Sequence, residues 1–217
     1  MKKVFNLVIV DESGSMWCIR EQAFTGINET LSTIKIMQEK FPDTEQHTTL
    51  VTFDTGHTTW HFDDALTDQV RKLQWDEYNP GGGTPLYDAI GNAISKVEKQ
   101  AEEGANVLVT IITDGEENSS REWTLSMIRQ RIDSLKKRGW TFSLIGTDNL
   151  DVESMAFSMN IDSHISFCQD VAGTKEMFCK ERRARNRYNT CICKDASIPM
   201  GGFFDLSEDD TDPLDDK

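Results

Sequence analysis

The sequence has no long apolar run, and this absence excludes a membrane-crossing helix. A membrane span needs roughly 18 or more uncharged apolar residues, whereas the apolar stretches of this chain are much shorter. The N-terminal run from Val4 to Val10 follows two lysines, as a signal peptide would, but it is short and lacks a small-residue cleavage site. We interpret this run as a buried strand and expect a soluble, cytoplasmic protein.

Basic residues are scarce. The chain has 23 lysines and arginines against 37 aspartates and glutamates, which gives a formal net charge of −14 at pH 7. Nucleic-acid binding requires a basic face that neutralises phosphates. The composition therefore argues against a nucleic-acid ligand and favours protein partners.

Cysteines are few and show no pairing pattern. The five cysteines are an odd number without the spacing of a small disulfide scaffold, which indicates reduced thiols. Cys191 and Cys193 form the only close pair, and a C-x-C without a second pair or a nearby histidine is weak evidence for zinc. Unpaired cysteines are the favoured interpretation.

Buried runs alternate with helix-period segments, which predicts an α/β fold: a doubly wound, mostly parallel sheet with one antiparallel edge strand and helices on both faces. The turn at 54–56 predicts the antiparallel edge hairpin. Pro85 begins one helix, and Ser119 with Glu122 predicts a capping box for the next. The expected strands are residues 4–10, 50–53, 58–62, 107–112, 140–145 and 164–167; the expected helices lie around 24–34, 85–97, 122–135 and 152–157.

The pattern weakens after about residue 168. We predict a core domain at 1–168, a C-terminal helix or extension at 169–204, and an acidic disordered tail at 205–217, where seven of thirteen residues are acidic. A closing helix is expected over 175–188. Its basic cluster is interpreted as a solvated face, against which the tail is an alternative occupant; the cluster comprises Lys180, Arg182, Arg183, Arg185 and Arg187.

Five oxygen-bearing residues follow predicted strands or precede a predicted helix, and together they suggest the ligands of one divalent metal: Asp11, Ser13, Ser15, Thr84 and Asp114. In a doubly wound sheet, ligands bind outside the carboxyl ends of the strands. Glycines 81–83 allow the loop before Thr84 to approach closely. Mg²⁺ prefers such oxygen ligands, with Mn²⁺ or Ca²⁺ possible, whereas the absence of Cys and His from the set makes zinc a poor match.

The D-x-S-x-S at 11–15, the threonine after glycines and the T-D-G at 113–115 resemble the metal-ion-dependent adhesion site of von Willebrand factor type A domains, over residues 3 to 168. The resemblance implies a Rossmann-like domain in which Ser13 and Ser15 bind the metal directly. It implies that Asp11, Thr84 and Asp114 bind directly or through water, and that a partner Asp or Glu completes the coordination. The chain looks like standalone prokaryotic members, which often act beside ATPases, kinases or metal-insertion complexes.

Each fragment also has an ordinary explanation as a turn or a helix cap. The loop 116–118 is interpreted as solvated, the four histidines as surface or hairpin residues, and Trp17 as either a core residue or an exposed contact. The rival function is a Mg²⁺-dependent hydrolase or phosphatase. The sequence disfavours an enzyme, because Ser13 replaces the second aspartate of aspartyl phosphatases and no phosphate loop or nucleophile elbow is present.

Overall fold

The computed structural model describes residues 1–196, 202–207 and 210–213. Within them, six strands form one sheet with the order β3-β2-β1-β4-β5-β6. Only the β2–β3 pair is antiparallel. The predicted α/β fold is confirmed, and so is its antiparallel edge strand. The strands are β1 (Lys2–Asp11), β2 (Thr44–Phe53), β3 (Thr58–Leu66), β4 (Asn106–Thr113), β5 (Thr141–Thr147) and β6 (Ser163–Phe167).

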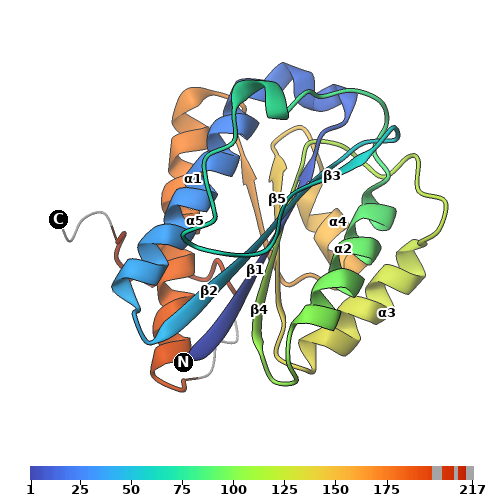
Figure 1. Ribbon diagram of the computed structural model, residues 1–217. Coiled ribbons are helices and arrows are strands. Elements are labelled where there is room, and N and C mark those ends of the chain that lie inside the picture. The colour runs from blue at the N-terminus through green and yellow to red at the C-terminus, as the bar shows by residue number, and fades with distance from the viewer. Residues whose placement is uncertain (197–201, 208–209, 214–217) are drawn as a thin grey trace.

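Helices cover both faces of the sheet (Figure 1). The helices α1 (Arg20–Lys40) and α5 (Val171–Cys193) pack on one face. The helices α2 (Leu86–Gln100), α3 (Leu125–Lys136) and α4 (Val152–Met159) pack on the other. Two short 3₁₀ helices, η1 (Gly14–Ile19) and η2 (Trp75–Glu77), lie in connections. No described helix is long and apolar enough to cross a membrane.

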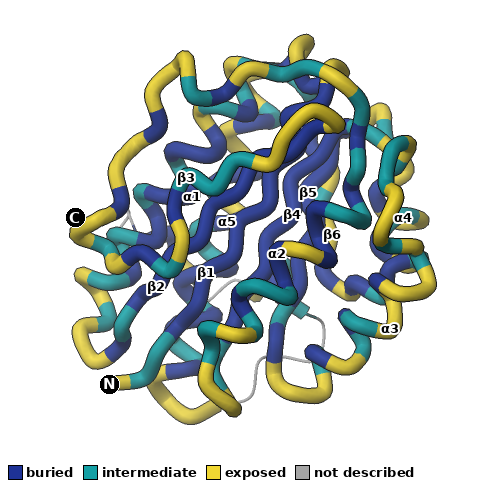
Figure 2. Tube along the Cα trace, turned by 45° about the vertical axis from the view of Figure 1, so that its right-hand side comes forward, coloured by how far each residue is buried: buried dark blue, intermediate teal, exposed yellow. Residues whose placement is uncertain are grey.

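The central strand β1 explains the continuous apolar run at the N-terminus. Successive side chains of a strand point to opposite faces, and here Phe5, Leu7 and Ile9 enter the core under α2 to α4. Val8 and Val10 enter the core under α1 and α5. Because both faces are covered, apolar residues are required at nearly every position of β1. The inner strands β1, β2, β4 and β5 are buried along nearly all of their length (Figure 2), whereas the edge strands β3 and β6 are partly exposed.

The predicted capping box at Ser119 and Glu122 is wrong. Helix α3 begins at Leu125, and Thr124 is its cap, with a side-chain oxygen that accepts a hydrogen bond from the Met127 amide at 3.4 Å. The amide of Ser119 instead donates to the Glu117 carboxylate at 2.8 Å. That carboxylate organises the loop before the helix, so the serine does not start a helix.

The predicted solvated basic face of α5 is wrong for Arg185, whose side chain is fully buried. Its guanidinium lies 2.5 Å from the Glu181 carboxylate, one turn earlier in the helix. It also donates to Asn6 Oδ1 at 2.6 Å and to Thr110 Oγ1 at 3.3 Å. A buried charge needs a partner of opposite sign, and Glu181 supplies it against the central strands.

The other arginines of the basic cluster hold part of the acidic C-terminal segment. Arg182 forms an ion pair with Asp212 at 2.8 Å, and both side chains are largely buried. Arg183 donates to the carbonyl of Ser207, and Arg187 to the carbonyls of Gly202 and Phe203. Residues 208–209 and 214–217 of the predicted disordered tail lie outside the described residues. The described residues of this segment, 205–207 and 210–213, lie against α5.

Candidate metal-binding site

The five candidate ligands come from three segments that meet at one end of the sheet. Asp11 is the last residue of β1, and Ser13 and Ser15 lie in the turn and short η1 helix that follow it. Asp114 immediately follows β4, and Thr84 precedes α2. Since β1 and β4 are adjacent parallel strands, their carboxyl ends place the loop at 11–15 next to Asp114.

Hydrogen bonds connect three of the side chains directly. The hydroxyls of Ser13 and Ser15 are 3.2 Å apart. The Ser15 hydroxyl donates to Asp114 Oδ1 at 2.7 Å. The two segments, 99 residues apart in sequence, therefore form one polar cluster.

The surroundings of Gly115 show where the remaining two side chains, those of Asp11 and Thr84, lie. A Cβ placed on Gly115 would lie 3.3 Å from Ser15 Oγ, 3.4 Å from Thr84 Oγ1 and 3.9 Å from Asp11 Oδ2. Oxygens from the first two segments therefore face Gly115 of the third, and the neighbouring Asp114 is bonded to Ser15. The structure brings all five residues together, with glycine at the position where a side chain would crowd them.

Backbone contacts hold the glycine loop, residues 81–83, against the loop at residues 11–15, which we call the metal loop. The Gly14 amide donates to the Gly82 carbonyl at 3.0 Å, and the Gly81 amide donates to the Glu12 carbonyl at 2.8 Å. Gly82 has a φ of +66°, a conformation that favours glycine. This close approach of two backbones positions Thr84.

Asp11 is fixed on both carboxylate oxygens. The Ser13 amide donates to Oδ1 at 2.7 Å, and the Thr113 hydroxyl donates to Oδ2 at 2.6 Å. The Tyr78 hydroxyl donates to the Asp11 carbonyl at 2.7 Å. Thr113 could have been found from the T-D-G motif, whereas no sequence pattern links Tyr78 to this site.

The loop after Asp114 is held by specific hydrogen bonds, and the interpretation of it as solvated is wrong only for Glu117, which is half-buried. Asn118 Oδ1 accepts a hydrogen bond from the Thr84 amide at 2.8 Å, and Glu117 accepts one from the Tyr87 amide at 3.0 Å. Only Glu116 and Asn118 are exposed, and Asn118 still binds the Thr84 segment. These residues position Thr84 and the start of α2.

Burial dominates the electrostatics of the two aspartates. It raises the pKa of Asp11 from 3.8 to about 6, despite hydrogen bonds from Thr113 and Ser13 that lower it. Burial also raises the pKa of Asp114. Two carboxylates removed from water and close to each other are destabilised when both are ionised, and a bound cation would reverse this effect.

The donor set suits a hard cation. The described residues contain no group of three or more His, Cys, Asp or Glu side chains arranged to hold a metal. The candidate cluster is of another composition, with two carboxylates and three hydroxyls. Such oxygens match the preference of Mg²⁺, which usually keeps several waters and takes only one or two protein carboxylates.

Trp17, two residues beyond Ser15, is exposed and not part of the core: 59% of its surface is accessible. The Arg20 guanidinium stacks on its ring at 5.1 Å from the centroid. The candidate site is therefore bordered by an exposed aromatic side chain.

The sequence matches the model of the von Willebrand factor type A domain over residues 7–178. The chain belongs to the von Willebrand factor type A domain family. Domains of this family are typically adhesion or protein-interaction modules and are usually not catalytic. No curated protein sequence matches this chain.

Several solved structures resemble this von Willebrand factor type A domain. Proximal thread matrix protein 1 from the mussel byssus is 19% identical, with a TM-score of 0.58 over 82% of this chain and 44% of that chain. The vWF domain of the type V pili tip protein Mfa5 from Porphyromonas gingivalis is 12% identical, with a TM-score of 0.61 over 91% of this chain and 97% of that chain. The SpRpn10 VWA domain is 13% identical, with a TM-score of 0.57 over 82% of this chain and 93% of that chain.

At these identities the resemblance shows the fold alone. This von Willebrand factor type A domain spans less than half the length of the mussel protein.

Proposed function

We propose that this domain binds a protein partner through a divalent metal, with Mg²⁺ the preferred ion and Mn²⁺ or Ca²⁺ as alternatives. Ser13 and Ser15 would bind the ion directly, whereas Asp11, Thr84 and Asp114 would bind it directly or through water. A partner Asp or Glu would complete the coordination. We extend the proposal to a cytoplasmic, prokaryotic protein whose partner belongs to an ATPase, kinase or other assembly complex.

The observation that carries the proposal is the convergence of Ser15, Thr84 and Asp11 oxygens around Gly115. Separate turn or cap explanations do not account for it, because a turn or a cap needs only its own segment. Here, side chains from two segments face Gly115 of the third segment, and the neighbouring Asp114 joins them through Ser15.

The charge of the donor set supports a binding role. Two carboxylates balance the charge of one divalent ion, and the three hydroxyls add none. When bound, such an ion supplies a Lewis-acidic position to which an external carboxylate can bind. Among the residues that surround it, Thr113, Tyr78 and Asn118 orient groups of the site through hydrogen bonds.

The direct test is isothermal titration of the metal-free protein with Mg²⁺, followed by capture of partners from the source cell in Mg²⁺ or in EDTA. Asp11→Ala is expected to remove both Mg²⁺ binding and partner capture while the circular dichroism spectrum is retained. Asp148→Ala is the matched control, because Asp148 is exposed just beyond the end of the neighbouring strand β5. Capture that persists in EDTA would contradict the proposal.

The hydrolase alternative is tested with the same proteins. Turnover of p-nitrophenyl phosphate is expected to be absent with and without Mg²⁺. Mg²⁺-dependent turnover that Asp11→Ala abolishes and Asp148→Ala retains would favour the enzyme instead.

A further inference from the structure

Two exposed tryptophans and one arginine form a surface cluster beside the candidate metal site. Trp17 follows the metal loop, and Trp75, in η2, is 47% exposed. The Arg20 guanidinium carbon lies 5.1 Å from the Trp17 ring centroid and 4.1 Å from that of Trp75. We call Trp17, Arg20 and Trp75 the tryptophan–arginine cluster.

The cluster is fixed relative to the metal loop. Arg20 Nε donates to the Tyr78 carbonyl at 2.8 Å, and the hydroxyl of the same tyrosine donates to the Asp11 carbonyl at 2.7 Å. Phe24 packs edge-on against Trp75 with ring centroids 5.1 Å apart. The spacing between Arg20 and the metal ligands is therefore built into the fold.

No carboxylate among the described residues neutralises the charge of Arg20. Its three hydrogen-bond acceptors are neutral oxygens, namely the carbonyls of Trp75 and Tyr78 and the side-chain amide of Asn79. No carboxylate in the described part of the chain forms an ion pair with it.

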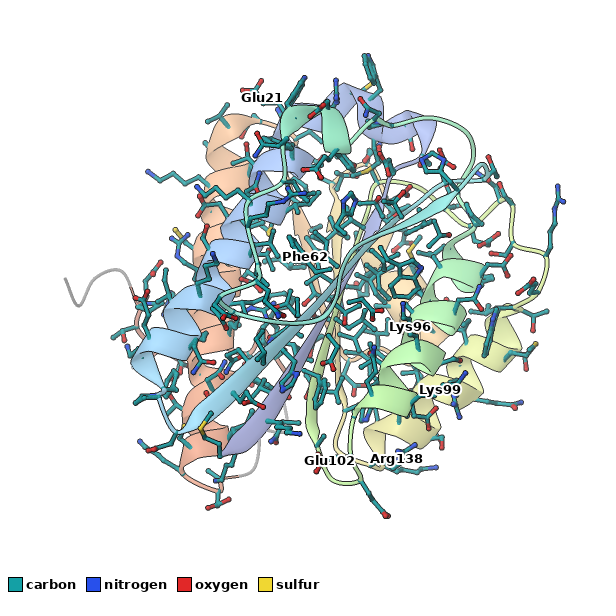
Figure 3. All side chains as sticks on the ribbon, viewed as in Figure 1. Glu21, Phe62, Lys96, Lys99, Glu102 and Arg138 are labelled. Carbon is teal, nitrogen blue, oxygen red and sulfur yellow. The ribbon has the colours of Figure 1, made fainter. Side chains whose placement is uncertain are left out.

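Neighbouring charges do not supply that carboxylate. Glu21 lies at the same end of the molecule, at the start of α1 (Figure 3), and Asp76 is exposed in η2; neither is within ion-pair distance of Arg20. Arg71, which precedes η2 in the sequence, differs from Arg20 because its guanidinium pairs with the Glu77 carboxylate at 2.6 Å. Arg20 is thus an unpaired guanidinium between two aromatic rings.

We infer that Arg20 binds a second carboxylate of the partner, so that the domain recognises an acidic polypeptide segment carrying two carboxylates, one for the metal and one for Arg20. The inference rests on the proposed function. Arg20 is half-buried beside the two tryptophan rings, and a charge-assisted hydrogen bond to a carboxylate is stronger where its donor is partly removed from water. Trp and Arg are also the residues most enriched at interface positions that dominate binding. An excess of basic residues in the partner would be repelled by the bound cation and by Arg20.

Selection from a displayed library of nine-residue peptides with a fixed central Glu tests the inference. The wild-type domain in Mg²⁺ is expected to enrich a second Asp or Glu at a defined spacing from the central one. Resynthesised peptides with the second carboxylate are expected to bind at least ten-fold more tightly than their Gln counterparts, measured by fluorescence anisotropy.

Arg20→Gln is expected to reduce that ratio to below about two while leaving binding of the single-carboxylate peptide dependent on Mg²⁺. Arg20→Lys is expected to restore part of the ratio, because it keeps the charge and loses the planar fork. Arg71→Gln is the matched control and is expected to leave the ratio unchanged. Mg²⁺ titration of each variant verifies that the metal loop is intact.

The possible failures are distinguishable. Two results would overturn the role of Arg20 alone. One is selection that EDTA abolishes but that shows no preference for a second acidic residue, and the other is such a preference that Arg20→Gln retains. Enrichment of basic residues also overturns it. Selection that is unchanged in EDTA overturns the metal proposal, and a wild-type domain that enriches no peptide in Mg²⁺ overturns both. Self-association through the tryptophans, visible as a dimer in light scattering that Arg20→Gln abolishes, would assign the cluster to a second copy instead.

Discussion

Gly115 borders the volume where the candidate ligands converge, and its lack of a side chain leaves that volume open. A Cβ there would lie within 3.4 Å of both Ser15 Oγ and Thr84 Oγ1. Gly115→Ala is therefore expected to weaken Mg²⁺ binding at least ten-fold, measured by calorimetry, with a small effect on stability in EDTA.

The matched control for that variant is Gly81→Ala, in the glycine loop of the same site, where an added Cβ meets nothing within 4 Å. We expect Gly81→Ala to retain wild-type Mg²⁺ affinity. Equal affinities for the two variants would show that the metal, if bound, lies away from Gly115.

The raised pKa of Asp11 predicts a pH dependence of the metal-free protein. Burial holds the pKa of this carboxyl at about 6 in the folded state, against 3.8 in its ordinary environment. The folded state then binds the proton more tightly than the unfolded state, so this residue favours folding below pH 3.8, and that contribution is lost as the pH rises through 6. Between pH 4.5 and 7.5 the loss is on the order of 2 kcal/mol, from 1.36 kcal/mol per pKa unit.

Urea unfolding in EDTA measures this dependence. The stability of wild type relative to Asp11→Asn, which is neutral throughout, is expected to fall by that amount as the pH increases. Mg²⁺ is expected to offset the loss at pH 7.5. Stability curves of wild type and Asp11→Asn that stay parallel across this range would contradict the assignment.

At the level of the elements, α5 contains a buried ion pair, one member of which is hydrogen-bonded to the sheet. Arg185 and Glu181 are each about 1% exposed, and Arg185 also reaches Asn6 in the central strand β1. Removing one partner of such a pair leaves an uncompensated buried charge and costs about 3–5 kcal/mol. We expect this loss in Arg185→Met by urea unfolding.

Replacement of both partners, in Glu181→Leu with Arg185→Met, is expected to recover most of the lost stability, because no buried charge remains. Lys180→Met is the control, since Lys180 pairs with Glu176 at an exposed position. A double variant as unstable as Arg185→Met would show that packing, and not charge, determines the loss.

The elements also show what the sequence could and could not predict. The carboxyl ends of β1, β2 and β4 were predictable because apolar runs and the residues that follow them are local patterns, and the approach of Asp11 to Asp114 follows from adjacent strands. The polar first half of β2, which begins at Thr44 and not at residue 50, was missed. The start of α3 was not, because Glu117 binds the serine amides that a helix cap would otherwise use. The burial of Arg185 was indicated in the sequence only by Asn6, a polar residue inside an apolar strand. A buried polar group needs a hydrogen-bond partner, and Arg185 is that partner.

At the level of the whole molecule, the described C-terminal residues close over α5. Arg182 and Asp212 are each 11% exposed, and the tail carbonyls of Ser207 and Asp205 accept hydrogen bonds from Arg183 and Arg187. Truncation after Phe204 is therefore expected to destabilise the protein by at least about 2 kcal/mol, since one hydrogen bond to a charged group contributes about 1.5–3 kcal/mol and the truncation removes several. Chemical unfolding of the full and truncated chains measures it.

The truncation is not expected to change Mg²⁺ affinity by more than about two-fold. The described contacts of the segment 205–213 are with α5 and not with the five candidate ligands. Arg182→Gln in the full chain is the companion variant and is expected to show part of the same loss of stability. Tighter Mg²⁺ or peptide binding after truncation would instead assign an inhibitory role to the tail.

The pairing of β1 with β4 has a consequence for the newly made chain. Val4 lies opposite Asn106, so this partner emerges only about 100 residues later, which at 5–20 residues per second takes roughly 5–20 s. During that interval one edge of an apolar strand has no neighbour, and unpaired edges are sites of association between chains. Crowded synthesis on neighbouring ribosomes is therefore the stage at which this protein is most exposed to aggregation.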